Sequence, residues 1–223
     1  IRGKYKVKKF VAVDNVSFTL EQGDMLGIVG TNGAGKSTLL KVVTKIMVPS
    51  KGSVTVNGKI AALLELASGF DGDLNLKENA YLRGAMLGYT RKFMDEKYPE
   101  ILEFSGLQEF EERPFKQLSS GMKSRLAFAI SCLVEPDILI LDDSASALDL
   151  ATDLKLRKAL DTLPDSPAVF IVSQRTSSVM SCDRIFVMED GMTEAAGTHS
   201  ELLTSSKVYK EIYDSQNGGA DNE

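Results

Sequence analysis

Short apolar runs alternate along the chain with segments in which apolar residues recur every three or four positions. A continuous apolar run of this length, bounded by turn residues, is typical of a buried strand. Four segments have this character: "DMLGIVG", "DILILDD", "AVFIVSQ" and "RIFVME". Helical spacing follows in four others: "GKSTLLKVVTKIM", "DLATDLKLRKALDTL", "HSELLTSS" and "KVYKEIYDSQ". The alternation predicts an α/β fold whose mostly parallel sheet is covered by helices on both faces.

Two further regions depart from this alternation. Residues 9–20 and 51–66 are rich in β-forming residues, and they predict an antiparallel β subdomain. From about Leu74 to Leu133 the spacing is mostly helical, which predicts an inserted α-helical subdomain. We therefore expect one domain over residues 1–223, with an α/β core and β subdomain at 1–73 and 136–215, helices at 74–135 and a flexible tail at 216–223.

Composition narrows the classes of function. The 223 residues carry a net charge of -5, so there is no basic stripe of the kind that neutralises a nucleic acid backbone, and nucleic-acid binding is disfavoured. No apolar stretch approaches the roughly 18 to 20 residues of a membrane-spanning helix, so a membrane role requires a partner protein. Cys132 and Cys182 form neither a metal-site spacing nor a disulfide framework, which favours a cytoplasmic location.

The stretch "GTNGAGKST", residues 30 to 38, matches the phosphate-loop pattern G-x-x-x-x-G-K-[ST] between a predicted strand and a predicted helix. Glycines allow consecutive backbone N–H groups to converge on a phosphate at a positive helix end. Lys36 is expected to reach the β- and γ-phosphates, Ser37 to ligate Mg²⁺, and Thr38 to contact the α-phosphate. The predicted ATP-binding residues here are Gly30, Thr31, Asn32, Gly33, Ala34, Gly35, Lys36, Ser37 and Thr38.

A second motif, "ILILDD", ends an apolar strand in Asp142. By itself, an apolar strand that ends in an acidic residue is more often packing than chemistry. Together with a phosphate loop it predicts that Asp142 holds the Mg²⁺ water shell. The two motifs predict a P-loop NTPase (RecA-like) core.

Between these motifs lies "QLSSGMKSRLAFAI", and on this stretch the chain resembles the ATP-binding subunits of ABC transporters. The residues that match the signature motif of that family are Leu118, Ser119, Ser120, Gly121 and Met122. The resemblance implies a head-to-tail dimer, in which each ATP lies between the phosphate loop of one subunit and the signature of a second, identical or different, ATP-binding domain. It also implies a membrane-spanning transporter subunit as partner. A simple helix N-cap explains Ser119 or Ser120 but not the ordered set.

The resemblance covers roughly residues 1 to 215 and changes character along the chain. Residues 1–135 look like subunits that power export of polysaccharides, teichoic acids or O-antigens. Residues 136–223 look more like the weakly active half of heterodimeric multidrug-type exporters. A chimera of two such domains, which binds ATP without physiological transport, is therefore an alternative to a single natural subunit. A soluble ABC protein without a transport role is a further alternative, whereas a small-molecule kinase has no use for the signature.

Four other positions are assigned roles through the same resemblance. The linker that couples to the membrane domain usually carries a glutamine, and Glu65, in "LLELASGF", is its nearest polar equivalent for the roles at Mg²⁺ and in coupling. Phe10 or Tyr5 is expected to stack on adenine, although core packing competes for Phe10. Asp149, in "SALD", resembles the loop that meets the opposite subunit. The only histidine, His199, is expected to be structural and to lie near the start of a late helix.

Two substitutions predict weak hydrolysis. Asp143 occupies the position at which the family carries the glutamate that polarises the attacking water, and Gln174 replaces the usual histidine of the switch position. Aspartate is one methylene shorter, so its oxygens stop about 1.5 Å short of a place where an effective base must lie within about 3 Å of its proton. Gln174 can donate a hydrogen bond to the γ-phosphate but cannot become a cation. We therefore expect good Mg-ATP binding and impaired hydrolysis.

Overall fold

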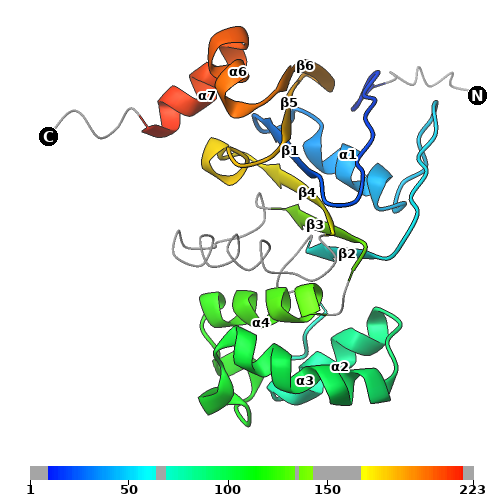
Figure 1. The fold of residues 1–223 in the computed structure, drawn as a ribbon, viewed down its shortest axis with the longest axis vertical. Coiled ribbons are helices and arrows are strands. Elements are labelled where there is room, and N and C mark those ends of the chain that lie inside the picture. Colours follow the sequence, from blue (N-terminus) through cyan, green and yellow to red (C-terminus); the bar gives the residue numbers. More distant parts are fainter. Residues whose placement is uncertain (1–9, 64–68, 134–135, 143–166, 218–223) are drawn as a thin grey trace, which may run out of the picture.

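A sheet of six strands organises the part of the chain that this computed structural model describes, residues 10–63, 69–133, 136–142 and 167–217 (Figure 1). The strands lie in the order β2-β3-β4-β1-β5-β6. Neighbours pair in parallel except for β5 and β6, which are antiparallel. The strand bounds are β1 Met25–Gly30, β2 Ile60–Leu63, β3 Ile138–Asp142, β4 Ala168–Ser173, β5 Arg184–Glu189 and β6 Met192–Gly197.

The helices form separate groups around this sheet (Figure 1). Helix α1 packs on β1 and β4, α4 contacts β2, and α6 and α7 lie near β6 and β1. Helices α2, α3 and α4 pack on one another around their own apolar cluster, which includes Leu76, Met94 and Ile101. The helix bounds are α1 Lys36–Val43, α2 Leu76–Met86, α3 Arg91–Ser105, α4 Ser120–Leu133, α6 His199–Ser205 and α7 Lys207–Asn217.

The predicted fold class is confirmed by the mostly parallel sheet, the antiparallel pair and the helical region. The four apolar runs became β1, β3, β4 and β5, whose residues are largely buried. Strand β6 was not predicted. It follows a two-residue turn in which Asp190 has φ 47° and Gly191 has φ 81°, the pattern of a tight hairpin.

The two segments predicted to be β-rich are largely without strands, so that prediction was wrong for them. Residues 10–24 contain no strand, and between 51 and 63 only Ile60–Leu63 forms one, β2, which pairs in parallel with β3. In the first segment Val16, Phe18 and Leu20 pack against the apolar cluster under the sheet. The alternation therefore arises from side-chain packing, without the ladder of hydrogen bonds that defines a strand.

Helix boundaries also differ from those expected. Helix α1 ends at Val43, well before Pro49, because Lys45 turns to a left-handed φ of 61°, a conformation with which helices commonly end. Helix α7 continues through Asn217, so residues 216 and 217, which were expected in the tail, are helical, and residues 218–223 lie outside the described residues. The helix predicted in "DLATDLKLRKALDTL" lies outside the described residues.

In the described residues, no helix combines the length and the apolar character needed to cross a membrane.

Candidate functional site

The loop between β1 and α1 has the backbone that its glycines predicted. Gly33 has φ 85° and Gly35 has φ 99°, both in the left-handed region that glycine adopts without steric cost. The N–H of Ala34 donates to the Thr31 carbonyl at 3.3 Å, which closes a turn, and Ala34 is buried while Thr31, Asn32 and Gly33 are exposed. The exposed turn therefore lies at the amino end of an eight-residue helix, where backbone N–H groups favour an anion.

Segments from both ends of the chain brace this loop. The Ala34 carbonyl accepts from the N–H of Gly191, in the β5–β6 turn, at 3.2 Å. The Gly191 carbonyl in turn accepts from the N–H of Asp14 at 2.7 Å. A Cβ built on Gly35 would lie 2.5 Å from the Ala12 carbonyl oxygen. Close backbone packing thus requires glycine at position 35.

Lys36 is folded onto the loop. Its side chain is largely buried, with 5% of the residue exposed, and Nζ donates to the carbonyls of Gly30 at 2.7 Å and Thr31 at 2.8 Å. Burial lowers the pKa of Lys36, and the Asp142 carboxylate opposes part of this effect. The charge of Asp142, at the end of β3, thus favours the protonated form of the phosphate-loop lysine.

The chemistry of Asp142 and Ser37 fits a magnesium ion. Asp142 ends β3 opposite Val172 of β4, and Ser37 is exposed in the first turn of α1. Within the described residues no group of three or more His, Cys, Asp and Glu side chains could hold a metal alone. Mg²⁺ is commonly bound by one or two carboxylates together with phosphates and water, so one carboxylate and one hydroxyl suit an ion shared with a nucleotide.

Gln174 follows the last residue of β4 at the same edge of the sheet. In the strand register, Ser173 lies opposite Val29 of β1, and Val172 lies opposite Asp142 of β3. Because β4 lies between β1 and β3, the residue after Ser173 lies between the phosphate loop and Asp142. Gln174 is half-buried there.

The signature residues begin α4, away from the phosphate loop of the same chain (Figure 1). The Ser119 hydroxyl accepts from the N–H of Met122 at 3.3 Å, as a helix N-cap does. Ser119 and Ser120 are exposed, and Gly121 and Met122 are half-buried. Capping accounts for Ser119, while Ser120 is exposed at the first position of α4.

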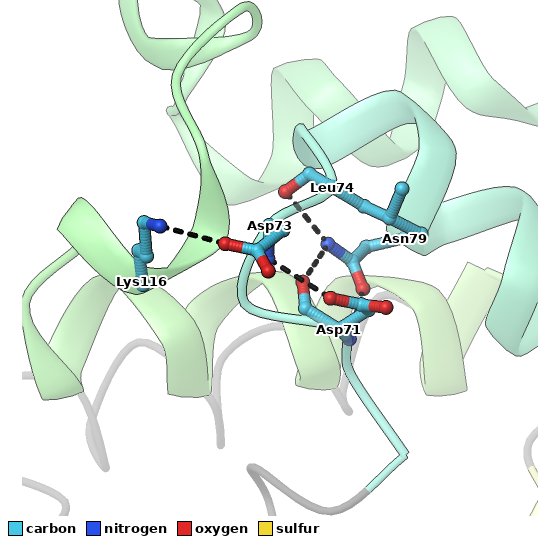
Figure 2. A network of polar contacts seen from close by, with 5 residues as sticks. All are labelled: Asp71, Asp73, Leu74, Asn79 and Lys116. Atoms are coloured by element: carbon cyan, nitrogen blue, oxygen red, sulfur yellow. Dashed lines mark hydrogen bonds and ion pairs between the residues drawn. The ribbon is translucent and has the colours of Figure 1, made fainter.

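A polar network fixes the loop before α2 (Figure 2). Asn79 accepts from the Asp71 N–H at 2.8 Å and donates to the carbonyls of Asp71 at 2.9 Å and Leu74 at 3.1 Å. Lys116 reaches Asp73 at 2.6 Å, and this contact lowers the pKa of the Asp73 carboxyl. The loop is thereby joined to the segment that precedes the signature.

Two aromatic rings extend this connection. Phe70 and Phe115 stack with ring centroids 4.5 Å apart and planes at 6°. Phe70 closely follows the undescribed residues 64–68, which include Glu65, and Phe115 closely precedes Ser119. The segment that follows residues 64–68 is therefore packed against the segment that precedes the signature, and Glu65 itself lies outside the described residues.

The remaining predicted site residues have different outcomes. Phe10 is 87% exposed, so core packing is excluded for it, and stacking on adenine stays a prediction. Tyr5, Asp143 and Asp149 lie outside the described residues.

The histidine prediction concerns the start of α6. Helix α6 begins at His199, whose Nδ1 is hydrogen-bonded to the Tyr209 hydroxyl at 2.8 Å. Tyr209 is fully buried. This contact joins α6 to α7 and is consistent with the structural role expected of His199.

Comparisons with known proteins agree with these motifs. A family model described as "ABC transporter" matches residues 13–146. The "O-antigen export system ATP-binding protein RfbB" of Klebsiella pneumoniae is 36% identical over 92% of this chain and 83% of its own length. The "Teichoic acids export ATP-binding protein TagH" of Bacillus anthracis is 38% identical over 86% of this chain, which spans 35% of that longer protein.

Two solved structures share the fold. An "ATP binding subunit of ABC transporter" has a TM-score of 0.78 and 21% identity, and the match covers 96% of each chain. A bacterial "Atm1-family ABC exporter with ATP bound" has a TM-score of 0.76 and 24% identity over 92% of this chain and 39% of that one. Because the RfbB match covers 92% of the chain, it extends to both sides of residue 136. The chimera and multidrug-type interpretations are therefore not supported.

Proposed function

The chain belongs to the ABC transporter family, and from this membership we propose that it is the ATP-binding subunit of an exporter for a polysaccharide or teichoic-acid type polymer. Support for the type of cargo comes from the relatives, which are named as O-antigen and teichoic acids export proteins. The membrane-spanning partner follows from the same names, which describe the ATP-binding protein of an export system.

The observation that carries the ATP-binding part is the braced phosphate loop with Lys36 folded onto it, at the end of the sheet where β3 ends in Asp142. Family membership implies binding of ATP and Mg²⁺. Lys36 would exchange its bonds to two loop carbonyls for phosphate oxygens, while the loop N–H groups hold the same phosphates. Ser37 and Asp142 would hold Mg²⁺, which neutralises phosphate charge when it is bound.

A second ATP-binding domain completes the proposed site. Ser119 and Ser120 are exposed at the start of α4, and this end of the helix lies away from the phosphate loop of its own chain (Figure 1). In a head-to-tail dimer they would bind the ATP held by the other subunit, with Asp149 at the contact. Exposed hydroxyl and N–H groups at a helix amino end suit a phosphate.

The proposed rate of hydrolysis is low. Asp143 is expected to be too short for its position, and Gln174 cannot carry the positive charge of a histidine. A misplacement of about 1 Å at a reacting group can lower a rate on the order of 10²-fold. ATP would then serve mainly to close the dimer, and turnover would be slow or would depend on a partner domain.

Steady-state ATPase assays test this proposal on the purified chain beside Asp143→Glu and Asp143→Glu/Gln174→His. The variants are expected to gain rate, with the larger gain for the double variant. An unaltered chain that turns over as fast as both variants refutes impaired hydrolysis. Calorimetry with Mg-ATP tests the binding part separately, and Lys36→Ala is the control that should bind Mg-ATP weakly. An unaltered chain that binds no nucleotide refutes the whole proposal.

A further inference from the structure

One side chain of α7 is hydrogen-bonded to the loop that carries Gln174. Gln216, in the last turn of α7, donates through Nε2 to the Gln174 carbonyl at 2.7 Å. Its Oε1 accepts from the Thr176 N–H at 2.9 Å and from the Thr176 hydroxyl at 3.1 Å. The amide therefore makes hydrogen bonds to both residues that flank Arg175.

The direction of the amide follows from its partners. A carbonyl can only accept and a backbone N–H can only donate, so the reversed amide would oppose like groups at both Gln174 and Thr176. Thr176 is buried, with 1% of its surface exposed, and the Arg175 N–H is separately bonded to the Ser173 hydroxyl at 2.8 Å. Between β4 and the short helix at Thr176–Ser178, the Gln174 carbonyl and the N–H groups of Arg175 and Thr176 thus each have a side-chain partner.

The side-chain hydrogen bonds of Gln216 differ from those of a neighbouring amide in the same helix. The neighbouring amide, Asn217, donates to the Tyr213 carbonyl at 2.9 Å within α7, which is an ordinary contact at a helix end. The side-chain hydrogen bonds of Gln216 instead reach a loop that lies about forty residues earlier in the chain. The loop they reach is the one that follows β4 between the phosphate loop and Asp142.

We propose that Gln216 is a positioning residue that holds the backbone of Gln174 in the place from which its side chain contacts the γ-phosphate. The inference rests on the proposed function, because it requires that ATP binds at this edge of the sheet. It makes α7 part of the apparatus that distinguishes ATP from ADP, so a displacement of α7 by a partner would change the preference for ATP.

Two measurements that do not require ATP hydrolysis test this inference on the full chain. In Gln216→Met, which keeps the length of the side chain and removes its polar groups, exchange of the Thr176 amide hydrogen should quicken about fivefold to tenfold, as expected for one lost hydrogen bond. Calorimetry should show binding of Mg-AMP-PNP weakened by about the same factor and binding of Mg-ADP changed less than about twofold. The matched control Asn217→Ala should leave both measurements unchanged.

A further variant separates positioning from a general structural effect. In a Gln174→Ala background, Gln216→Met should not weaken Mg-AMP-PNP further, because the side chain that it positions is gone. Unchanged exchange at Thr176, equal weakening of both nucleotides, or an undiminished effect in the Gln174→Ala background would each overturn the inference. An unaltered chain that binds neither nucleotide would instead refute the proposed function, and the inference with it.

Discussion

Replacing Gly35 with alanine tests the bracing of the phosphate loop, and Gly33→Ala is a matched control in the same loop. Both residues have positive φ, 99° at Gly35 and 85° at Gly33. They differ in their surroundings: a Cβ at Gly35 would lie 2.5 Å from the backbone oxygen of Ala12, whereas a Cβ at Gly33 would meet nothing within 4 Å. The pair therefore separates conformational strain from steric collision.

The two costs can be estimated from these distances. A left-handed conformation costs an L-residue roughly 1–2 kcal/mol, so Gly33→Ala should lower the free energy of unfolding by about that amount. The same strain applies to Gly35→Ala, and forcing a methyl group against a backbone atom that cannot rotate away adds about 1–3 kcal/mol. Gly35→Ala should therefore be less stable than Gly33→Ala by about 1–3 kcal/mol.

Equilibrium unfolding in urea measures this difference. The chain contains no tryptophan, so far-ultraviolet circular dichroism is the suitable signal. Gly35→Ala should unfold at a clearly lower urea concentration than Gly33→Ala with a similar slope. Equal midpoints, or a lower midpoint for Gly33→Ala, would refute the conclusion that Ala12 limits the space at Gly35.

Two other predictions concern the helical groups. Asn79→Ala should lower the free energy of unfolding by about 2–3 kcal/mol, because it leaves the N–H and carbonyl groups of the loop without their buried partner. Asp73→Asn should leave the urea midpoint unchanged, because the contact of Asp73 with Lys116 is exposed. Comparable losses in both variants would contradict this. Tyr209→Phe should lower the free energy of unfolding by about 1 kcal/mol, because the hydrogen bond to His199 is lost. Burial raises the pKa of Tyr209 to about 12, so its hydroxyl stays protonated and the decrease should be the same in urea titrations at pH 7 and pH 9. A loss that disappears at pH 9 would count against it.

The sheet was largely predictable because its central strands are buried on both faces. Strand β4 is buried at every position, so its sequence is a continuous apolar run with no competing helical period. The sequence of β6, "MTEAAG", alternates exposed and half-buried positions and has no such run. In residues 10–20 the opposite error arose, because alternating apolar residues pack under the sheet without pairing to a strand.

The candidate site was predictable as far as its chemistry is local in sequence. The phosphate loop carries its own backbone requirements, and Gly33 and Gly35 have the positive φ that such a loop needs. Contacts between segments that are distant in the chain produce no comparable sequence pattern. Nothing in the spacing of "SQN" near the end of α7 indicates that Gln216 bonds to Gln174, because the pairing depends on how α7 packs against the sheet.

The position of β1 in the sheet also bears on how the protein is made. Its two neighbours, β4 and β5, both belong to the last third of the chain, and the turn that bonds to Ala34 comes later still. A growing chain on the ribosome therefore exposes the whole "GTNGAGKST" long before any strand can pair with β1. Such distant pairing slows folding and leaves an open strand edge that can join other chains. The loop would acquire its braced form only when synthesis has passed residue 191, so nucleotide affinity would mark a chain in which β1 has both of its neighbours, β4 and β5.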